Sequence, residues 1–304
     1  MRTDEIGIKQ IDYAEHRYIE VNGARYGYLE AGQGPMVLLI HGYPDNAYSW
    51  EHQITFLADA GYRVIVPFAR GYAPTKTGKG SFFDRATIAL DMVGLIDELN
   101  EGDPVYLVGQ DWGAAISYGI LGAFPEKIKR AVVLAVPHPV EINRTLRKSL
   151  RHCLRSFHWF LFQLPWFPEK LIRWSRGGFL RFLWKIWSPD FNDAEHVDQV
   201  TSAMLQGRGV EDTLAYYRAA VQTAYRDQNL KSVFERLDDK ISVPTLTLCG
   251  RQDMRKELLP RAADCFCESA DYQWSLIDNA GHFLHREQPE VVNKEILRWL
   301  SWDR

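Results

Sequence analysis

Apolar residues gather in short runs that alternate with longer amphipathic segments. The runs MVLLIHG (36–42), RVIVPFARG (63–71), PVYLVG (104–109) and AVVLAVP (131–137) contain too few polar positions for a strand with one wet face. They predict strands that are buried on both faces. Helical spacing fills the intervals, at about 48–60, 83–99 and 112–124. This alternation predicts a largely parallel sheet flanked by helices and joined by right-handed crossovers.

The pattern differs at the two ends and in the middle of the chain. Near the start, HRYIEV and RYGYLEAG flank Asn22-Gly23, a dipeptide typical of a tight turn between antiparallel strands. From about Pro139 to Asn229 no strand pattern occurs. Buried-strand spacing returns at 243–249, and a helix, a strand at 272–278 and an amphipathic helix at 289–300 are predicted after it. We therefore predict an α/β core of residues 1–137 and 231–304, interrupted by a helical cap at 138–230.

Composition narrows the class of protein. The chain has 304 residues, 46% hydrophobic residues and a net charge of −3, which excludes global disorder and gives no electrostatic case for binding nucleic acid. No apolar run approaches the roughly 20 residues of a transmembrane helix, and the first ten residues lack the apolar segment of a signal peptide. Four irregularly spaced cysteines favour a reducing cytoplasm, and no metal site is predicted.

The segment Gly109-Gln110-Asp111-Trp112-Gly113 lies between a predicted strand and a predicted helix. It has the G-x-S-x-G spacing of a nucleophile elbow, with aspartate in the serine position. The helix dipole favours a negative charge at this end of a helix. The alternative is an aspartate that only caps the helix, as aspartate at a helix start often does.

Two further segments supply the partners that an elbow needs. His41-Gly42-Tyr43-Pro44 follows the first buried strand, so the backbone amides of Tyr43 and Trp112 are predicted to form an oxyanion hole. The segment DNAGHFLHREQPE places His282 on a loop before the last helix, in the order nucleophile, acid, histidine.

The predicted acid is Asp253, three residues after Gly250 and the strand that follows the cap. Asp278 is the alternative, but its place at a strand end favours a loop-fixing role. A carboxylate at this position would orient the His282 imidazole and stabilise its charged form. His285 is expected to pack at the start of the last helix.

With these residues the chain resembles the α/β-hydrolase superfamily, and within it the branch of epoxide hydrolases and haloalkane dehalogenases. The resemblance rests on HGYP at 41–44, GQDWGA at 109–114, the Asp253 region and AGHF around His282. It implies an α/β-hydrolase fold and an alkyl-enzyme ester on Asp111 that is hydrolysed by water, with no cofactor. It also implies a cis bond between Tyr43 and Pro44. Gln110 departs from the histidine usual in these families.

The resemblance extends into the cap. Epoxide hydrolases usually donate hydrogen bonds from two cap tyrosines, and the matching positions here are Tyr217 and His158, so both are predicted to be catalytic donors. Together with Trp159 they also resemble the halide pocket of fluoroacetate dehalogenases. The arginines that bind the substrate carboxylate in those enzymes are replaced here by Trp112 and Ala115.

These residues predict an epoxide hydrolase that acts on a small apolar molecule and water. The alternatives are a haloalkane or haloacid dehalogenase with the same nucleophile, and a non-catalytic ligand-binding member of the fold. His41, Pro44 and Trp159 are expected to line the substrate pocket. The sequence leaves open whether the protein forms a homodimer. It also leaves open whether the basic, aromatic segment 141–190 contacts a membrane or a partner.

Overall fold

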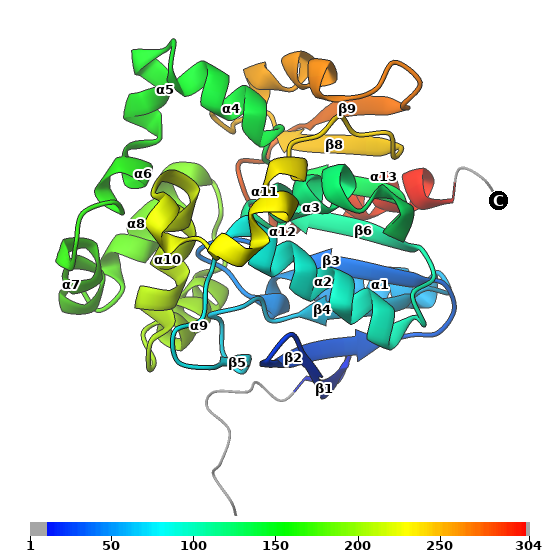
Figure 1. Ribbon diagram of the computed structural model, residues 1–304, viewed down its shortest axis with the longest axis horizontal. Helices are drawn as coiled ribbons and strands as arrows, with labels where there is room; N and C mark the ends of the chain where they lie inside the picture. The colour runs from blue at the N-terminus through cyan, green and yellow to red at the C-terminus, as the bar shows by residue number, and fades with distance from the viewer. Residues whose placement is uncertain (1–10, 302–304) are drawn as a thin grey trace, which may run out of the picture.

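The computed structural model describes residues 11–301 (Figure 1). Nine strands within that range form one sheet, in the order β1-β2-β4-β3-β6-β7-β8-β9, with β5 beside β2. Their bounds are β1 Glu15–Val21, β2 Ala24–Ala31, β3 Met36–Ile40, β4 Arg63–Pro67, β5 Lys76–Thr77, β6 Val105–Gln110, β7 Ile128–Leu134, β8 Thr245–Gly250 and β9 Tyr272–Ile277.

The sheet is parallel from β4 to β9 and antiparallel at its first edge, where β2 pairs with β1, β4 and β5. Strand β3 is buried along its whole length, as expected for a strand covered by helices on both faces. The predicted hairpin forms at Asn22 and Gly23, whose φ angles of 48° and 72° suit a type I′ turn. The α/β-hydrolase architecture predicted from the sequence is thus confirmed.

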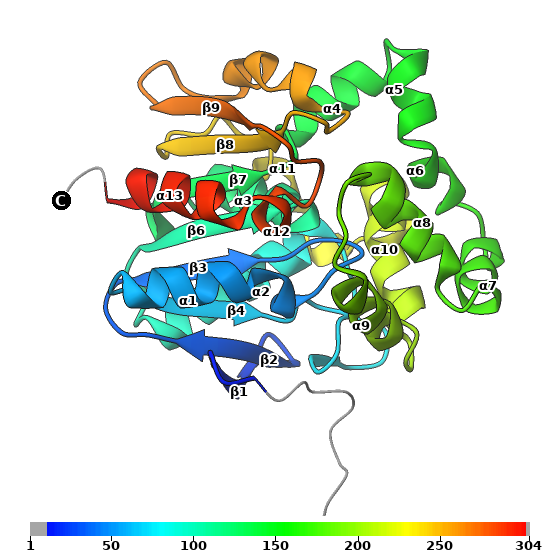
Figure 2. The same cartoon turned by 180° about the vertical axis from the view of Figure 1, so that it is seen from behind.

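Helices cover both faces of the sheet. Those of the core are α1 Glu51–Asp59, α2 Arg85–Leu99, α3 Trp112–Ala123, α11 Lys231–Arg236, α12 Leu284–Glu287 and α13 Pro289–Leu300. Helices α2, α3 and α11 pack together on the face toward the viewer in Figure 1, while α1 and α13 lie on the face seen in Figure 2. The 3₁₀ helices are η1 Ala47–Trp50, η2 Pro125–Lys127, η3 Thr223–Tyr225, η4 Gln228–Leu230, η5 Lys256–Leu258 and η6 Pro260–Cys265.

The segment after β8 differs from the sequence prediction of a helix. It forms only the two short 3₁₀ helices η5 and η6. The Asp253 carboxylate accepts the Arg255 N–H at 2.7 Å, and such a local bond competes with helix formation. Pro260 then lacks the N–H that a continuous helix would need at that point. The short strand β5 and the one-turn helix α12 were not predicted.

The segment between β7 and β8 is helical, as its lack of strand pattern predicts. Its helices are α4 Pro139–Leu146, α5 Leu150–Arg155, α6 Phe157–Leu161, α7 Phe167–Trp174, α8 Gly178–Trp187, α9 Ala194–Met204 and α10 Gly209–Val221. Because the segment leaves the sheet after β7, it lies at the carboxyl ends of the parallel strands, and α6–α10 gather there in both views. We call residues 138–230 the cap; the domain boundaries at 138 and 230 stay predictions.

Two polar contacts fasten the cap to the core. Nε2 of His196 on α9 lies 2.8 Å from Oδ1 of Asp45. The Arg286 guanidinium of α12 donates to Asp193 at 2.6 Å. Both residues of the first pair are buried, so this contact is shielded from solvent. The cap is therefore held close to the loop that precedes α1.

Three further findings concern residues 11–301. No helix there is both long and apolar enough to cross a membrane. No group of three or more histidine, cysteine, aspartate or glutamate side chains is arranged to hold a metal ion in that part of the chain. All four cysteines lie in the described range and are unpaired.

Candidate active site

Asp111 lies on the turn between β6 and α3. Its backbone has φ 52° and ψ −114°, a conformation that is costly for a residue with a side chain. Although Asp111 directly precedes α3, its carboxylate makes no capping hydrogen bond to that helix. The helix-cap interpretation therefore fails, and the carboxylate is free for other partners.

The two glycines of the elbow are required by close packing. A Cβ atom on Gly113 would lie 2.0 Å from the Ile40 carbonyl oxygen, and one on Gly109 would lie 2.3 Å from Oγ of Ser117. Any side chain at either position would force β3, β6 and α3 apart. The spacing G-x-D-x-G is thus a packing requirement that allows the sharp turn.

Asp111, His282 and Asp253 meet at the carboxyl ends of the strands. Nε2 of His282 lies 3.1 Å from Oδ2 of Asp111, and its Nδ1 lies 2.8 Å from Oδ2 of Asp253. The loop that carries the histidine is fixed on both sides. The backbone N–H of His282 donates to the Trp187 carbonyl at 3.1 Å, and Gln110 Nε2 donates to the His282 carbonyl at 3.2 Å. Gln110 thus supports the loop that carries His282.

The electrostatics of these residues follow from their burial and pairing. Burial alone would lower the pKa of His282, but hydrogen bonds and charge from Asp111 and Asp253 outweigh it and raise that pKa to about 9. Burial opposes ionisation of Asp111, yet His282, the Tyr43 amide and the charge of Arg255 hold the Asp111 pKa below its ordinary value. Asp111 is therefore an anion at neutral pH, as a carboxylate nucleophile must be.

The predicted oxyanion-hole residues lie at this carboxylate. The Tyr43 N–H donates to Oδ1 of Asp111 at 2.9 Å. Trp112 is the first residue of α3, so its N–H has no acceptor within the helix. The Tyr43–Pro44 bond is cis, as the resemblance implies. The Tyr43 amide thus contacts the carboxylate on which an oxyanion would form, and the Trp112 amide follows that residue directly in the chain.

A cavity of about 410 Å³ opens beside Asp111. Trp112, Trp159 and Tyr217 line it together with apolar side chains of the cap such as Ile142 and Leu146. This volume suits a small organic ligand. A larger hollow of about 800 Å³ lies between the loop 71–81 and helices α9 and α10, but neither Asp111 nor His282 lines it. Asp111 therefore faces the smaller cavity.

The two predicted cap donors have different surroundings. Tyr217 lines the cavity, and burial together with the nearby Asp111 charge raises its pKa well above 10, so its hydroxyl stays protonated. His158 does not line the cavity. Its ring lies among aromatic rings, 4.9 Å from that of Trp187 and 5.9 Å from that of Tyr217. Burial, followed by the charge of Arg255, lowers the pKa of His158 to about 3, so the ring is neutral.

Only one of the three residues expected to line the pocket does so. Trp159 stacks on Trp112 in the cavity, with ring centroids 5.6 Å apart. His41 is absent from the lining because its ring is used inside the loop, where Nε2 accepts the Ala69 N–H and Nδ1 lies 3.1 Å from the Gly42 carbonyl. Pro44 is also absent, and its carbonyl accepts the Trp184 indole N–H at 3.3 Å. Both residues shape the oxyanion loop from behind.

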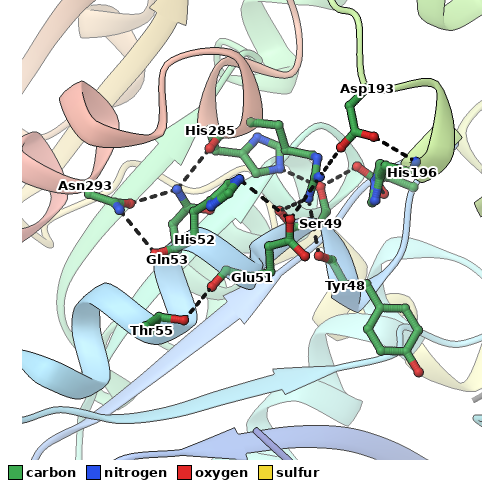
Figure 3. A network of polar contacts seen from close by, with 12 residues as sticks. Tyr48, Ser49, Glu51, His52, Gln53, Thr55, Asp193, His196, His285 and Asn293 are labelled. Atoms are coloured by element: carbon green, nitrogen blue, oxygen red, sulfur yellow. Dashed lines mark hydrogen bonds and ion pairs between the residues drawn. The ribbon is translucent and has the colours of Figure 1, made fainter. Parts of the chain in front are cut away.

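His285 packs near the end of the chain as expected, but it also joins a polar network (Figure 3). Its Nε2 lies 2.7 Å from Oγ of Ser49, and the Ser49 hydroxyl donates to the Asp45 carboxylate. The Trp50 ring covers the His285 ring at a centroid distance of 4.6 Å. We call Asp45, Ser49, His196 and His285 the Ser49 network. No motif of the sequence indicated it.

Four arginines that no sequence motif indicated also line the cavity, namely Arg85, Arg147, Arg226 and Arg255. They come from α2, the cap and the loop after Asp253, so no single spacing connects them. The only available signal was the position of Arg255, two residues after the predicted acid. The cavity lining is thus less apolar than the predicted apolar substrate would require.

Comparison with known proteins agrees with the fold. The sequence pattern of the Alpha/beta hydrolase family matches residues 37–295. The chain is 29% identical over 316 residues to epoxide hydrolase A of Mycobacterium tuberculosis, covering 94% of this chain and 97% of that protein. It is 28% identical over 296 residues to an AB hydrolase superfamily protein of Bacillus subtilis, covering 96% of this chain and 99% of the relative.

Solved structures give the same result. The fold matches the crystal structure of epoxide hydrolase A from Mycobacterium thermoresistibile with a TM-score of 0.78 at 25% identity, covering 95% of this chain and 98% of the other. An epoxide hydrolase from Vigna radiata matches with a TM-score of 0.78 at 27% identity, covering 97% and 100%. With the family pattern spanning most of its length, this chain belongs to the Alpha/beta hydrolase family and is a hydrolase that resembles the epoxide hydrolases.

Proposed function

We propose that this protein is an epoxide hydrolase that converts a small epoxide with an apolar body to a vicinal diol. The observation that carries the proposal is the ionised Asp111 carboxylate in a cavity lined by Tyr217, with one oxygen at the Tyr43 amide and the other at His282. The named relatives that are epoxide hydrolases support the same reaction.

In the first half-reaction a carboxylate oxygen of Asp111 attacks an oxirane carbon. The carbon–oxygen bond of the ring breaks, and an ester joins Asp111 to the substrate. The leaving oxygen takes the proton of the Tyr217 hydroxyl, which the raised pKa keeps in place until an alkoxide forms. His158 is proposed as a second donor in its neutral form, at 5.9 Å from Tyr217 between ring centroids.

In the second half-reaction water hydrolyses the ester. Alkylation removes the negative charge of Asp111, one of the two groups that raise the pKa of His282. His282 can then pass its proton through water to the Tyr217 phenolate and act as the base that deprotonates a second water, while Asp253 holds its Nδ1. The hydroxide adds to the carbonyl carbon of the ester, and the Tyr43 and Trp112 amides stabilise the oxyanion. Collapse releases the diol and restores the Asp111 carboxylate, and the proton taken from water leaves His282 protonated, as it was at the start.

A dehalogenase with the same nucleophile is the second candidate. Trp112 lies in the cavity next to the nucleophile and against Trp159, where indole N–H groups could stabilise a leaving halide. Tyr217 in the lining favours an alkoxide leaving group, because a hydroxyl can give a proton to oxygen, whereas a departing halide needs none. A non-catalytic binding protein is the third candidate. A cytoplasmic location and a homodimer stay predictions.

A product assay separates the candidates. The protein is incubated with styrene-oxide-type epoxides and, separately, with bromoalkanes and haloacids, while diol and halide are measured. Diol formation without halide release is expected. Halide release with no diol would make the protein a dehalogenase, and binding without turnover of either set would contradict catalysis.

The cap donors are tested by paired variants. Tyr217→Phe is expected to slow alkylation of Asp111 by about 10²-fold or more while leaving ester hydrolysis near its original rate. His158→Phe should slow alkylation less, because His158 does not line the cavity. Single-turnover kinetics resolve the two steps. Equal losses in both steps for Tyr217→Phe would indicate a packing role instead.

A further inference from the structure

The four arginines that line the cavity beside Asp111 are not equally compensated. Arg85 pairs with Asp238 at 3.0 Å. Arg226 donates to the Ala219 and Ala220 carbonyls at 2.7 and 2.9 Å and covers the Phe234 ring. Arg147 is exposed, so solvent screens its charge. Only Arg255 combines burial with the lack of a partner.

Arg255 lies two residues after Asp253 and is 8% exposed. Its backbone N–H is bound to the Asp253 carboxylate at 2.7 Å. Among residues 11–301 its guanidinium makes no hydrogen bond and has no carboxylate within 4 Å. A buried cation without a directly bound anion is costly, and the five N–H donors of a guanidinium normally find acceptors. The side chain reaches the cavity, so a ligand can supply those acceptors.

No protein carboxylate in the cavity lining can supply the acceptors that the Arg255 guanidinium needs. Asp111 uses its oxygens for the Tyr43 amide and for His282. Asp238 is bound to Arg85. The lining also holds the amide side chains of Gln163, which is bound to Gln222, and of Asn143, which is exposed. The other walls near the nucleophile, including Trp112, Val136 and Trp159, are apolar or aromatic. A planar, bidentate anion is the complement that a guanidinium in such a site would bind most tightly.

We propose that Arg255 is a specificity residue that binds a carboxylate on the substrate, so that the preferred substrates are epoxides that also carry a carboxylate. This inference rests on the proposed function for the epoxide. Binding of the carboxylate by Arg255 does not depend on it. The carboxylate would lie at Arg255, the apolar body against the tryptophans, and the oxirane at Asp111.

Arg255 lies elsewhere in the chain than the arginines that bind the substrate carboxylate in fluoroacetate dehalogenases. Those lie one and four residues after the nucleophile, where this chain has Trp112 and Ala115. Without arginines at those positions, the elbow itself offers an anionic substrate no cation. The loop after β8 brings one, Arg255, to the same cavity. The positive charge also offsets the repulsion that an anionic substrate would meet from Asp111.

Binding is tested first without any reaction. Isothermal titration calorimetry compares 3-phenylpropanoate with the uncharged 3-phenylpropanamide on the wild type, Arg255→Gln, Arg255→Lys and the control Arg251→Gln. Arg251 lies on the same loop but is exposed and paired with Asp278. The carboxylate is expected to bind the wild type about tenfold or more tightly than the amide. Arg255→Gln should abolish that preference, Arg255→Lys should keep part of it, and Arg251→Gln should keep all of it.

Turnover then tests specificity with 4-carboxystyrene oxide and its carboxamide. The KM ratio of amide to carboxylate is expected to fall by about tenfold or more in Arg255→Gln, because only the carboxylate loses a bidentate partner. Arg255 also helps to keep Asp111 ionised, and that effect would change both substrates alike. An unchanged ratio, or a wild type with no preference in either assay, overturns the proposal.

The two assays separate this inference from the proposed function. Turnover of neutral epoxides without any carboxylate preference would leave the proposed function intact and remove the role of Arg255. Carboxylate binding that depends on Arg255, without diol from any epoxide, would support the anion site and contradict the epoxide reaction.

Discussion

His282 and His285 are three residues apart and both are buried, yet their partners give them opposite acid–base properties. His282 lies between two carboxylates, which raise its pKa to about 9. Among residues 11–301 no carboxylate lies in direct contact with His285, and burial lowers its pKa to about 3. Burial alone therefore does not decide whether a histidine is charged; direct contact with an anion does.

The two histidines belong to different clusters, the Asp111–His282–Asp253 cluster and the Ser49 network. The order of the groups in each cluster determines its chemistry as much as their identity does. In the Ser49 network Ser49 lies beside His285 (Figure 3). On its other side Ser49 contacts Asp45, so its hydroxyl proton is directed at that carboxylate. In a catalytic triad the histidine occupies the middle position and takes the proton of the nucleophile. The network thus contains the residue types of a serine hydrolase in an order that holds loops together.

The largest difference between the Asp111–His282–Asp253 cluster and the Ser49 network is expected in diol formation, measured on matched glutamine variants. His282→Gln should reduce diol formation by about 10²–10⁴-fold, because the ester on Asp111 loses its base. His285→Gln keeps an N–H for Ser49 and should leave diol formation close to that of the wild type. Intact-mass spectrometry after incubation with an epoxide should show a stable adduct only for His282→Gln, and peptide mapping should place it on Asp111. An adduct on another residue would refute the assignment.

A second prediction concerns stability. Asp45→Asn removes a buried negative charge that contacts His196 and Ser49. The free energy of unfolding should fall by about 3 kcal/mol, as for other hydrogen bonds to buried charges. The kcat of the folded protein should change little, because neither Asp45 nor His196 lines the cavity beside Asp111. Chemical denaturation and initial rates on the same samples measure both quantities. A large loss of kcat with unchanged stability would show that the network acts in catalysis.

The smallest expected effect is on the pH dependence of stability, where the clusters should act in opposite directions. Both histidines have a pKa near 6.5 in the unfolded chain. Because the folded pKa of His282 is raised to about 9, its contribution is complete below pH 6.5 and is lost as the pH rises toward 9. The folded pKa of His285 is lowered to about 3, so the folded state resists protonation and stability falls as the pH drops below 6.5.

Glutamine variants separate these two effects. His282→Gln should flatten the alkaline side of the stability curve by about 1–3 kcal/mol, and His285→Gln should flatten the acid side by a similar amount. Urea unfolding between pH 5 and 9 provides the measurement, with the wild type as reference. If both variants flatten the same side, the charge states assigned to the two histidines are wrong.

The sequence was informative wherever local pattern controls structure. The unbroken apolar run at β3 and the pair Asn22-Gly23 predicted a buried strand and a hairpin because both depend on neighbouring residues alone. The helix predicted after β8 failed for a local reason that the pattern does not record, the bond from the Arg255 N–H to Asp253. The partners of His41 are also invisible in the sequence, because Ala69 approaches from the next strand connection.

By itself the sequence determined the fold class, the elbow at Asp111 and the order of acid and histidine, since strand period, glycine spacing and chain order are written along the chain. Tertiary structure decided what each polar side chain faces. It placed Arg255 without a partner beside Asp111, enclosed His158 among aromatic rings and set His285 against Ser49, 236 residues away. Charge, donor role and access to the cavity depend on such distant contacts, because pKa and hydrogen bonding are set by neighbours in space rather than in sequence.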